Sequence, residues 1–178
     1  FSTDEELTTA EKNTPMNIST SSKSSTKKRD VTKKIGGQQL KLTNQDKIYF
    51  PELEIRKSVV IDYYQSMATF ILPHLKDRAQ SLNRFPNGID GMSFYQKDAG
   101  DETPNWIPTQ EVYSESTDKY IDYLICNDKA TMAYLNNLGC IEFNPWTSKI
   151  SNLDKPSYLV LDLDPSDNNS FEDVIEVA

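Results

Sequence analysis

The sequence contains few of the residues that carry common enzyme chemistry. It has one histidine, two cysteines and six glycines in 178 residues. His74 lies at the end of a predicted helix, and no serine or cysteine has the context of an activated nucleophile, which argues against the usual hydrolase sites. The glycines never form G-x-x-x-x-G-K or G-x-G-x-x-G, and a K-x-D-G lysine nucleophile is also absent. Cys126 and Cys140 lack a C-x-x-C spacing, so we expect both to be reduced core residues.

The sequence also lacks an excess of positive charge and a long apolar run. Acidic residues outnumber basic ones 27 to 19, for a formal net charge of −8, which argues against nucleic-acid binding by bulk electrostatics. A few placed cations, or metal ions held by acidic side chains, would still bind phosphates. No run approaches the ~20 apolar residues of a membrane span, and the start has no signal-peptide core. We therefore expect a soluble cytoplasmic protein and, because it begins with Phe1, a piece of a longer one.

The first 34 residues differ in composition from the remainder. They contain thirteen Ser or Thr residues and few large apolar ones. A segment of this composition cannot bury enough apolar surface to offset its ordering entropy. We therefore predict a flexible linker or tail over 1–34 and one ordered domain over 35–178.

Hairpins mixed with helices over 35–178 predict an α+β fold, with a mixed or antiparallel sheet and flanking helices. One amphipathic helix is expected to begin at Ser58 as N-cap and to end at Pro73, and a second to cover 127–139 with Asn127 as N-cap. The first helix should carry an apolar stripe of Val59, Tyr63, Met67 and Phe70. Strands are expected within 38–44, 81–97, 111–127, 140–146 and 157–165.

The stretch "YLVLDLDPSDN", residues 158–168, places Asp162 and Asp164 two positions apart at the end of an apolar run. In a strand, side chains at i and i+2 point to the same face, with β-carbons roughly 7 Å apart. Two carboxylates this close repel each other unless a cation lies between them. Two interpretations follow from the residues: a metal site, or a strand that runs out into an acidic, solvated loop.

Several motifs occur in a specific order over 40–178, namely "LTNQDKIYFPE", Lys57, "NRFPNGIDGMSFYQK", "LNNLGCIEFNPW" and "LVLDLDP". In this order and spacing the sequence resembles the polymerase domain of bacterial ATP-dependent DNA ligase D. That domain belongs to the archaeo-eukaryotic primase-polymerase superfamily and serves non-homologous end joining. The resemblance implies that 35–178 is the N-terminal part of a primase-polymerase-like fold, and that 1–34 joins it to a ligase or phosphoesterase module.

The resemblance implies a catalytic role for the two acids. Asp162 and Asp164 match a pair that holds two divalent metal ions for nucleotidyl transfer from a nucleoside triphosphate. Oxygen ligands suit Mg²⁺ or Mn²⁺, and two such ions activate the primer 3′-hydroxyl and stabilise the leaving pyrophosphate. The family's Ser/His motif and third catalytic aspartate match no residue here, so we expect residues 1–178 alone to be inactive as a polymerase.

The resemblance also implies a contact with the end of a DNA strand. Lys47 and Lys57 match lysines that hold the 5′-phosphate of a downstream strand, and Asn44 lies nearby in the same loop. Two ammonium groups suit a phosphate dianion at a gap or end.

An aromatic pair is the remaining part of the DNA contact implied by the resemblance. Phe94 and Tyr95 match residues that meet template bases. Because neighbours in a strand face opposite sides, we expect one ring to stack on a base and the other to pack inward. Arg84 and Lys97 flank the same hairpin and are candidates for phosphate contacts.

Partners and alternatives follow from the same resemblance. The expected partners are DNA ends with a 5′-phosphate, a Ku-type end-binding protein and covalently linked ligase or phosphoesterase domains, at the nucleoid of a bacterial cytoplasm and without a membrane. One alternative is a DNA-end-binding module without catalysis. Another is a haloacid-dehalogenase-like phosphatase, whose D-x-D motif "LVLDLDP" superficially resembles, although Pro165 argues against it.

Overall fold

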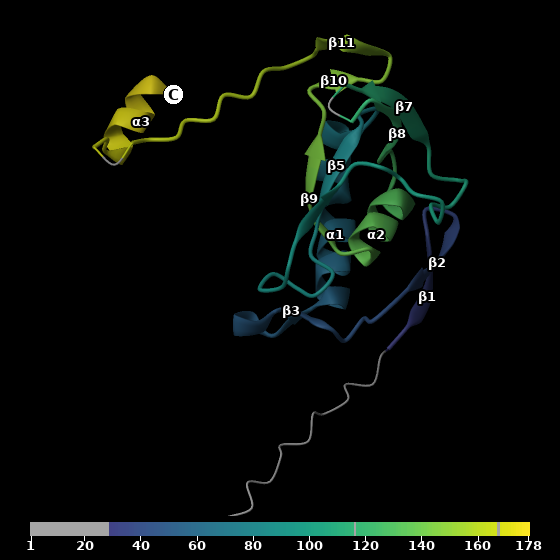
Figure 1. Cartoon of the computed structure of the whole chain (residues 1–178). Coiled ribbons are helices and arrows are strands. Elements are labelled where there is room, and N and C mark those ends of the chain that lie inside the picture. Colours follow the sequence, from purple (N-terminus) through teal and green to yellow (C-terminus); the bar gives the residue numbers. More distant parts are fainter. Residues whose placement is uncertain (1–28, 116, 167) are drawn as a thin grey trace, which may run out of the picture.

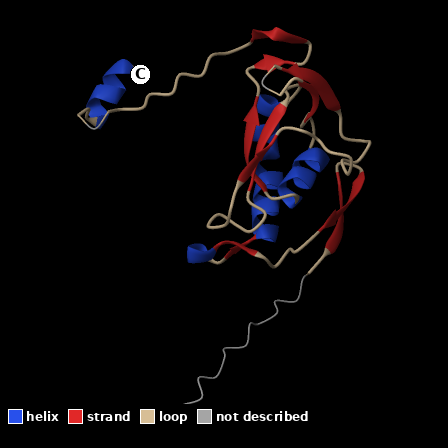
Figure 2. Cartoon of the chain, in the orientation of Figure 1, coloured by secondary structure: helices blue, strands red, loops and turns tan. Residues whose placement is uncertain are grey.

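The structure is a computed structural model that describes residues 29–115, 117–166 and 168–178 (Figures 1 and 2). Most of the predicted linker, residues 1–28, lies outside the described residues. The elements are β1 (Val31–Ile35), β2 (Gln38–Leu42), β3 (Ile48–Phe50), the 3₁₀ helix η1 (Pro51–Leu53), β4 (Ile55–Arg56), α1 (Lys57–Leu75), β5 (Gln80–Arg84), β6 (Phe94–Gln96), β7 (Thr109–Ser114), β8 (Lys119–Leu124), α2 (Lys129–Asn137), β9 (Cys140–Pro145), β10 (Ser148–Lys149), β11 (Asn152–Pro156) and α3 (Phe171–Val177). The predicted α+β class is confirmed.

An antiparallel sheet in the order β6-β5-β9 lies at the centre. Leu82 of β5 pairs with Gln96 on one side and with Phe143 on the other. The main core fills the space between this sheet and the helices α1 and α2; its buried members include Ala68, Leu75, Leu82, Met132, Leu135 and Cys140. Both cysteines are buried and unpaired, as predicted. Burial raises the pKa of Cys126 to about 12, so the thiol is unreactive.

The hairpin of β7 and β8 forms as predicted and lies beside the central sheet. Its strands pair antiparallel from Thr109 opposite Leu124 to Ser114 opposite Lys119, and an isolated bridge joins Ile125 to Ala79 just before β5. The hairpin therefore extends the core beyond the three-stranded sheet.

The N-terminal hairpin begins earlier in the sequence than predicted. β1 pairs with β2 across Gly36 and Gly37, which have φ values of 54° and 89°. Positive φ at both central residues is the requirement of a tight hairpin turn, and glycine meets it without strain. Residues 31–34, assigned above to the linker, thus form most of β1. Leu40 and Leu42 of β2 pack against α1 and α2, with Ile35 of β1 beside them, and the Lys33 ammonium of β1 donates to the Asp62 carboxylate of α1 at 3.0 Å.

Helix α1 is amphipathic, but the predicted stripe is not its buried face. Val60, Ile61, Ala68 and Leu75 are buried, whereas Val59, Tyr63 and Phe70 of the predicted stripe are exposed. The helix carries two neighbouring apolar stripes, and the one that contains the small Ala68 lets α2 and the sheet approach closely. Pro73 lies within the last turn instead of ending the helix, which runs to Leu75.

Helix α2 begins one residue later than predicted. The Asp128 carboxylate, not Asn127, caps it by accepting the N–H of Thr131 at 2.8 Å. The Asn127 side chain instead accepts the N–H of Asp77 at 2.8 Å. Gly139 follows the helix with a φ of 95°, as expected for its C-terminal end. No helix among the described residues is both long and apolar enough to cross a membrane.

The strand predicted over 157–165 does not form. Leu159, Val160 and Leu161 are 78%, 67% and 76% exposed, and in Figure 1 the segment runs away from the body toward α3. A strand needs a neighbour for its N–H and C=O groups, and the described part of the chain places no strand beside this segment. The residues of this segment have the apolar composition of a strand, but none of the described strands pairs with them.

Arg78 anchors the point at which this segment leaves the body. Its buried guanidinium donates to the carbonyls of Trp146 and Thr147 at 3.0 and 2.7 Å, and to the Ser157 hydroxyl at 2.6 Å. The same group lies 4.7 Å from the ring centroid of Tyr158. The planar guanidinium thus binds the residues just before β10 and just after β11, and it holds Ser157 against the start of β5.

Candidate nucleic-acid interface

The loop 43–47, between β2 and β3, covers the beginning of α1. The backbone N–H groups of Lys57 and Ser58 donate to the carbonyls of Lys47 and Gln45 at 2.8 and 3.1 Å. A helix leaves its first N–H groups without partners inside the helix, and here the loop backbone supplies them. For this reason Ser58 is not the N-cap: that position belongs to Arg56, which makes no side-chain cap.

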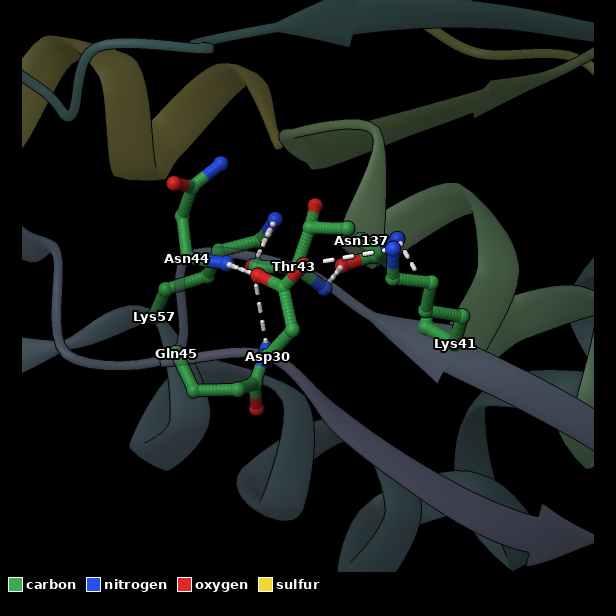
Figure 3. Close-up of polar contacts among 7 residues, drawn as sticks. All are labelled: Asp30, Lys41, Thr43, Asn44, Gln45, Lys57 and Asn137. Carbon is green, nitrogen blue, oxygen red and sulfur yellow. Dashed lines mark hydrogen bonds and ion pairs between the residues drawn. The ribbon is translucent and has the colours of Figure 1, made fainter. Parts of the chain in front are cut away.

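Asn44 gives the loop its shape. It has a φ of 53°, in the left-handed region that asparagine tolerates better than most residues. Its backbone N–H donates to the Asp30 carboxylate at 3.0 Å (Figure 3). Asp30 also forms an ion pair with Lys41 at 3.4 Å. Asn44 thus forms a left-handed turn that the Asp30 carboxylate holds, and its carbonyl accepts the N–H of Lys47 at 3.0 Å.

The far side of the loop is tied to the end of α2. The Asn137 side chain accepts the N–H of Thr43 at 2.8 Å and donates to the carbonyl of Lys41 at 3.2 Å (Figure 3). These two bonds mimic the pairing of one more strand residue. They fix Thr43, whose carbonyl is the acceptor for Lys57.

Lys57 is a buried cation at the first position of α1. Only 3% of the residue is exposed, and its ammonium donates to the Thr43 carbonyl at 2.8 Å. Burial and the nearby charge of Lys47 lower the pKa of Lys57 to about 8, against the opposing effect of Asp30. A buried ammonium beside a second cation is costly unless an anion joins them.

Lys47 reaches the loop that follows β5. Its half-buried ammonium donates to the carbonyl of Pro86 and, at 2.7 Å, to the side-chain oxygen of Asn87. The structure thus places Asn44 and Lys47 in one loop, next to Lys57 at the start of α1, and their part in binding a phosphate stays a prediction. Sequence reasoning did not identify Thr43, Pro86 or Asn87, since the acceptors are mostly backbone groups and carry no residue signature.

The aromatic pair lies on the edge strand β6, and neither ring packs inward. Phe94 is 45% and Tyr95 65% exposed, so the expectation that one of them is a core residue is wrong. The Arg84 guanidinium lies 5.1 Å from the ring centroid of Phe94. It therefore occupies the place that an apolar neighbour would take beneath that ring.

The Arg84 side chain is used in hydrogen bonds within the fold, whereas Lys97 is solvent-exposed. Arg84 donates to the carbonyl of Leu138 at 2.9 Å and to the side-chain oxygen of Gln96 at 2.7 Å. Burial lowers its pKa from the ordinary value. Lys97 follows β6 directly and is exposed. Of the two candidates for phosphate contacts, Lys97 is the accessible cation.

Asp162 and Asp164 are not assembled with the lysines. Both are exposed in the segment that leaves the body beyond β11, whereas β3 and the loop 43–47 lie at the opposite end of the body (Figure 1). Among the described residues, no group of three or more His, Cys, Asp or Glu side chains is close enough to hold a metal ion. The two carboxylates supply oxygen donors of the type that Mg²⁺ and Mn²⁺ prefer, but a complete ligand set is not formed by the described residues.

Comparisons with known proteins agree on one family. The family model for the LigD primase-polymerase domain matches residues 56–178. The chain is 31% identical over 139 residues to the bifunctional non-homologous end joining protein LigD of Bacillus subtilis, and 27% identical over 143 residues to the multifunctional non-homologous end joining protein LigD of Mycolicibacterium smegmatis. The alignments cover 78% and 79% of this chain, and 22% and 18% of those proteins.

A solved structure matches as well. The polymerase domain from Mycobacterium tuberculosis ligase D in complex with DNA superposes with a TM-score of 0.59 and 27% identity, over 62% of this chain and 38% of that chain. The chain belongs to the LigD primase-polymerase domain family. This confirms the resemblance drawn from the sequence and removes the support for a haloacid-dehalogenase-like phosphatase. The chain spans about a fifth of the length of the curated relatives it matches.

Proposed function

We propose that this part of the chain recognises the 5′-phosphate of a DNA end through Lys47 and Lys57. The observation that carries the proposal is the burial of the Lys57 ammonium beside a second lysine, at a loop whose backbone is fixed on both sides. A site that keeps two lysines close together is suited to a doubly charged ligand, and a terminal phosphate is one.

Single-stranded template next to that end is the second proposed ligand. Phe94 and Tyr95 offer exposed rings on one edge strand, and bases stack on such rings without regard to sequence. Lys97, next to the strand, is placed for a backbone phosphate. The similar polymerase domain from Mycobacterium tuberculosis ligase D was solved in complex with DNA, which supports DNA as a ligand.

For the whole protein we propose nucleotidyl transfer at broken DNA ends. Asp162 and Asp164 would hold Mg²⁺ or Mn²⁺, which neutralises charge on the triphosphate and activates the primer hydroxyl. The residues of this chain would orient the end: the lysines bind the 5′-phosphate and the aromatic edge binds the template. Covalently linked end-joining domains and a Ku-type end-binding protein are the proposed partners, because the relatives are named as non-homologous end joining proteins.

The experiment for the proposed function compares two DNA ends. Fluorescence anisotropy at one fixed salt concentration measures the affinity for a recessed duplex with a 5′-phosphate and for the same duplex with a 5′-hydroxyl. We expect the phosphate to improve the affinity about tenfold or more, since a charge-assisted contact contributes roughly 1.5–3 kcal/mol. Equal affinities would contradict the phosphate site, whereas a non-catalytic end-binding module would give the same preference as a polymerase.

The preference for phosphate should depend on pH through Lys57. With a pKa of about 8, the unbound side chain loses its proton as the pH rises through 8, and binding the phosphate then requires proton uptake. The affinity ratio of 5′-phosphate to 5′-hydroxyl DNA should therefore be constant between about pH 7 and 7.5 and fall between 8 and 9.5, by at most about tenfold per pH unit. Lys57→Arg is the control, because arginine stays protonated and should give a flat ratio.

A further inference from the structure

The loop that follows β5 is fastened to β3 at a very close approach. The N–H of Ile89 donates to the carbonyl of Tyr49 at 2.8 Å. Gly88 has a φ of 88°, and a Cβ atom placed there would lie 3.0 Å from the carbonyl oxygens of Ile48 and Tyr49. Glycine suits this position, because any other residue would strain the backbone at this φ and would press its Cβ atom against the two carbonyl oxygens. The loop backbone is thus fixed without help from the Asn87 side chain.

Asn87 itself is exposed, and its side-chain oxygen accepts a hydrogen bond from Lys47 at 2.7 Å. The carbonyl of Pro86 accepts a second bond from the same ammonium. An ammonium group has three N–H donors, and the described residues accept hydrogen bonds from two of those of Lys47, which leaves the third for a ligand. Both acceptors are neutral, and the full positive charge of Lys47 is therefore retained.

We propose that Asn87 is a positioning residue for phosphate recognition, which holds the Lys47 ammonium in place beside Lys57 without neutralising it. The inference rests on the proposed 5′-phosphate site. A lysine side chain has four flexible torsions, and fixing them in the unbound protein lowers the entropy lost when phosphate binds. The neutrality of the amide is essential, because a carboxylate at the same place would form an ion pair with Lys47 and repel the phosphate.

The test uses two substitutions that differ in charge. Asn87→Ala releases the ammonium and should lower the affinity ratio of 5′-phosphate to 5′-hydroxyl DNA about threefold. Asn87→Asp is nearly identical in shape and should lower the ratio tenfold or more. Asn105→Asp adds the same charge to another exposed loop residue and is the matched control, which should leave the ratio within about twofold of the unmutated value.

A purely structural role for Asn87 would weaken binding to both DNA ends alike and leave their ratio unchanged. A double-mutant cycle makes the distinction sharper: in a Lys47→Ala background, Asn87→Ala should no longer change the ratio, because there is no ammonium left to position. An equal loss with and without Lys47, or an unchanged ratio in both Asn87 variants, would overturn the inference. If the unmutated chain discriminates and Lys57→Ala removes the discrimination while the Asn87 variants do not, the proposed function stands and only this inference fails. If the unmutated chain shows no preference, both fail.

Discussion

Replacing Lys57 with alanine should remove most of the difference in affinity between 5′-phosphorylated and 5′-hydroxyl DNA ends. The buried ammonium makes a charge-assisted contact worth roughly 1.5–3 kcal/mol. Its loss therefore corresponds to a tenfold to hundredfold weaker binding of the phosphorylated end, since about 1.4 kcal/mol is a factor of ten. The chain carries a net charge of −8, so non-specific attraction should not hide the effect. Anisotropy on the matched duplexes at fixed salt measures it.

Two variants keep this result interpretable. Lys57→Met retains the apolar length of the side chain and removes the charge, so it should fold like the unmutated chain and lose the preference as Lys57→Ala does. Lys119→Ala, at the exposed start of β8, removes one positive charge away from the loop and should leave the preference unchanged. A preference that survives both Lys57 variants would remove the phosphate assignment.

Asp162→Asn should nearly abolish templated primer extension. The protein to test is a polymerase domain as long as those of the relatives, with this sequence as part of it. A metal ligand of this type contributes several kcal/mol to the transition state, which corresponds to a rate lower by roughly a thousandfold. The affinity for a 5′-phosphorylated end should not change, because the lysine site is elsewhere. Primer extension with Mn²⁺ and anisotropy measure the two quantities separately.

The control for this variant is Asp154→Asn, which removes an exposed carboxylate from β11. It should extend primers at the unmutated rate. Asp164→Asn should behave like Asp162→Asn, because the two acids lie two residues apart and are expected to share the metal ions. Normal extension by either of these two variants, with Mn²⁺ present, would exclude them as metal ligands.

Local patterns predicted the elements whose partners are close in sequence. The hairpins β5–β6 and β7–β8 follow from alternating residues around turns, and α2 follows from its periodicity and from Gly139. The Gly36–Gly37 turn was also present in the sequence, but the composition of residues 1–34 outweighed it. The choice of buried face on α1, and the lack of a strand over 158–164, depend on which surfaces are available for packing and pairing, and a single-sequence pattern does not contain that information.

The candidate site was predictable only in part for the same reason. Lys47, Lys57 and Asn44 were found through their match to a family motif, not through any local signal. The contacts of Lys47 with Pro86 and Asn87 join residues 39 and 40 positions apart. The acceptor of Lys57 is a backbone carbonyl, which every residue possesses. Contacts of this kind appear only when the chain is folded.

Arg78 limits how far the segment that carries Asp162 and Asp164 can reach. Its guanidinium holds Ser157 against the body. The two candidate metal ligands follow this fixed residue by five and seven positions in the chain. A fully extended chain spans at most about 3.6 Å per residue, so the α-carbon of Asp162 lies within about 18 Å of that of Ser157, and the α-carbon of Asp164 within about 25 Å. Whatever groups complete a metal site with these carboxylates must lie within that reach, extended by an aspartate side chain and by two metal–oxygen bonds of about 2 Å each. One residue inserted after Ser157 would widen it by about 3.4 Å and turn the acids to the opposite side of an extended chain.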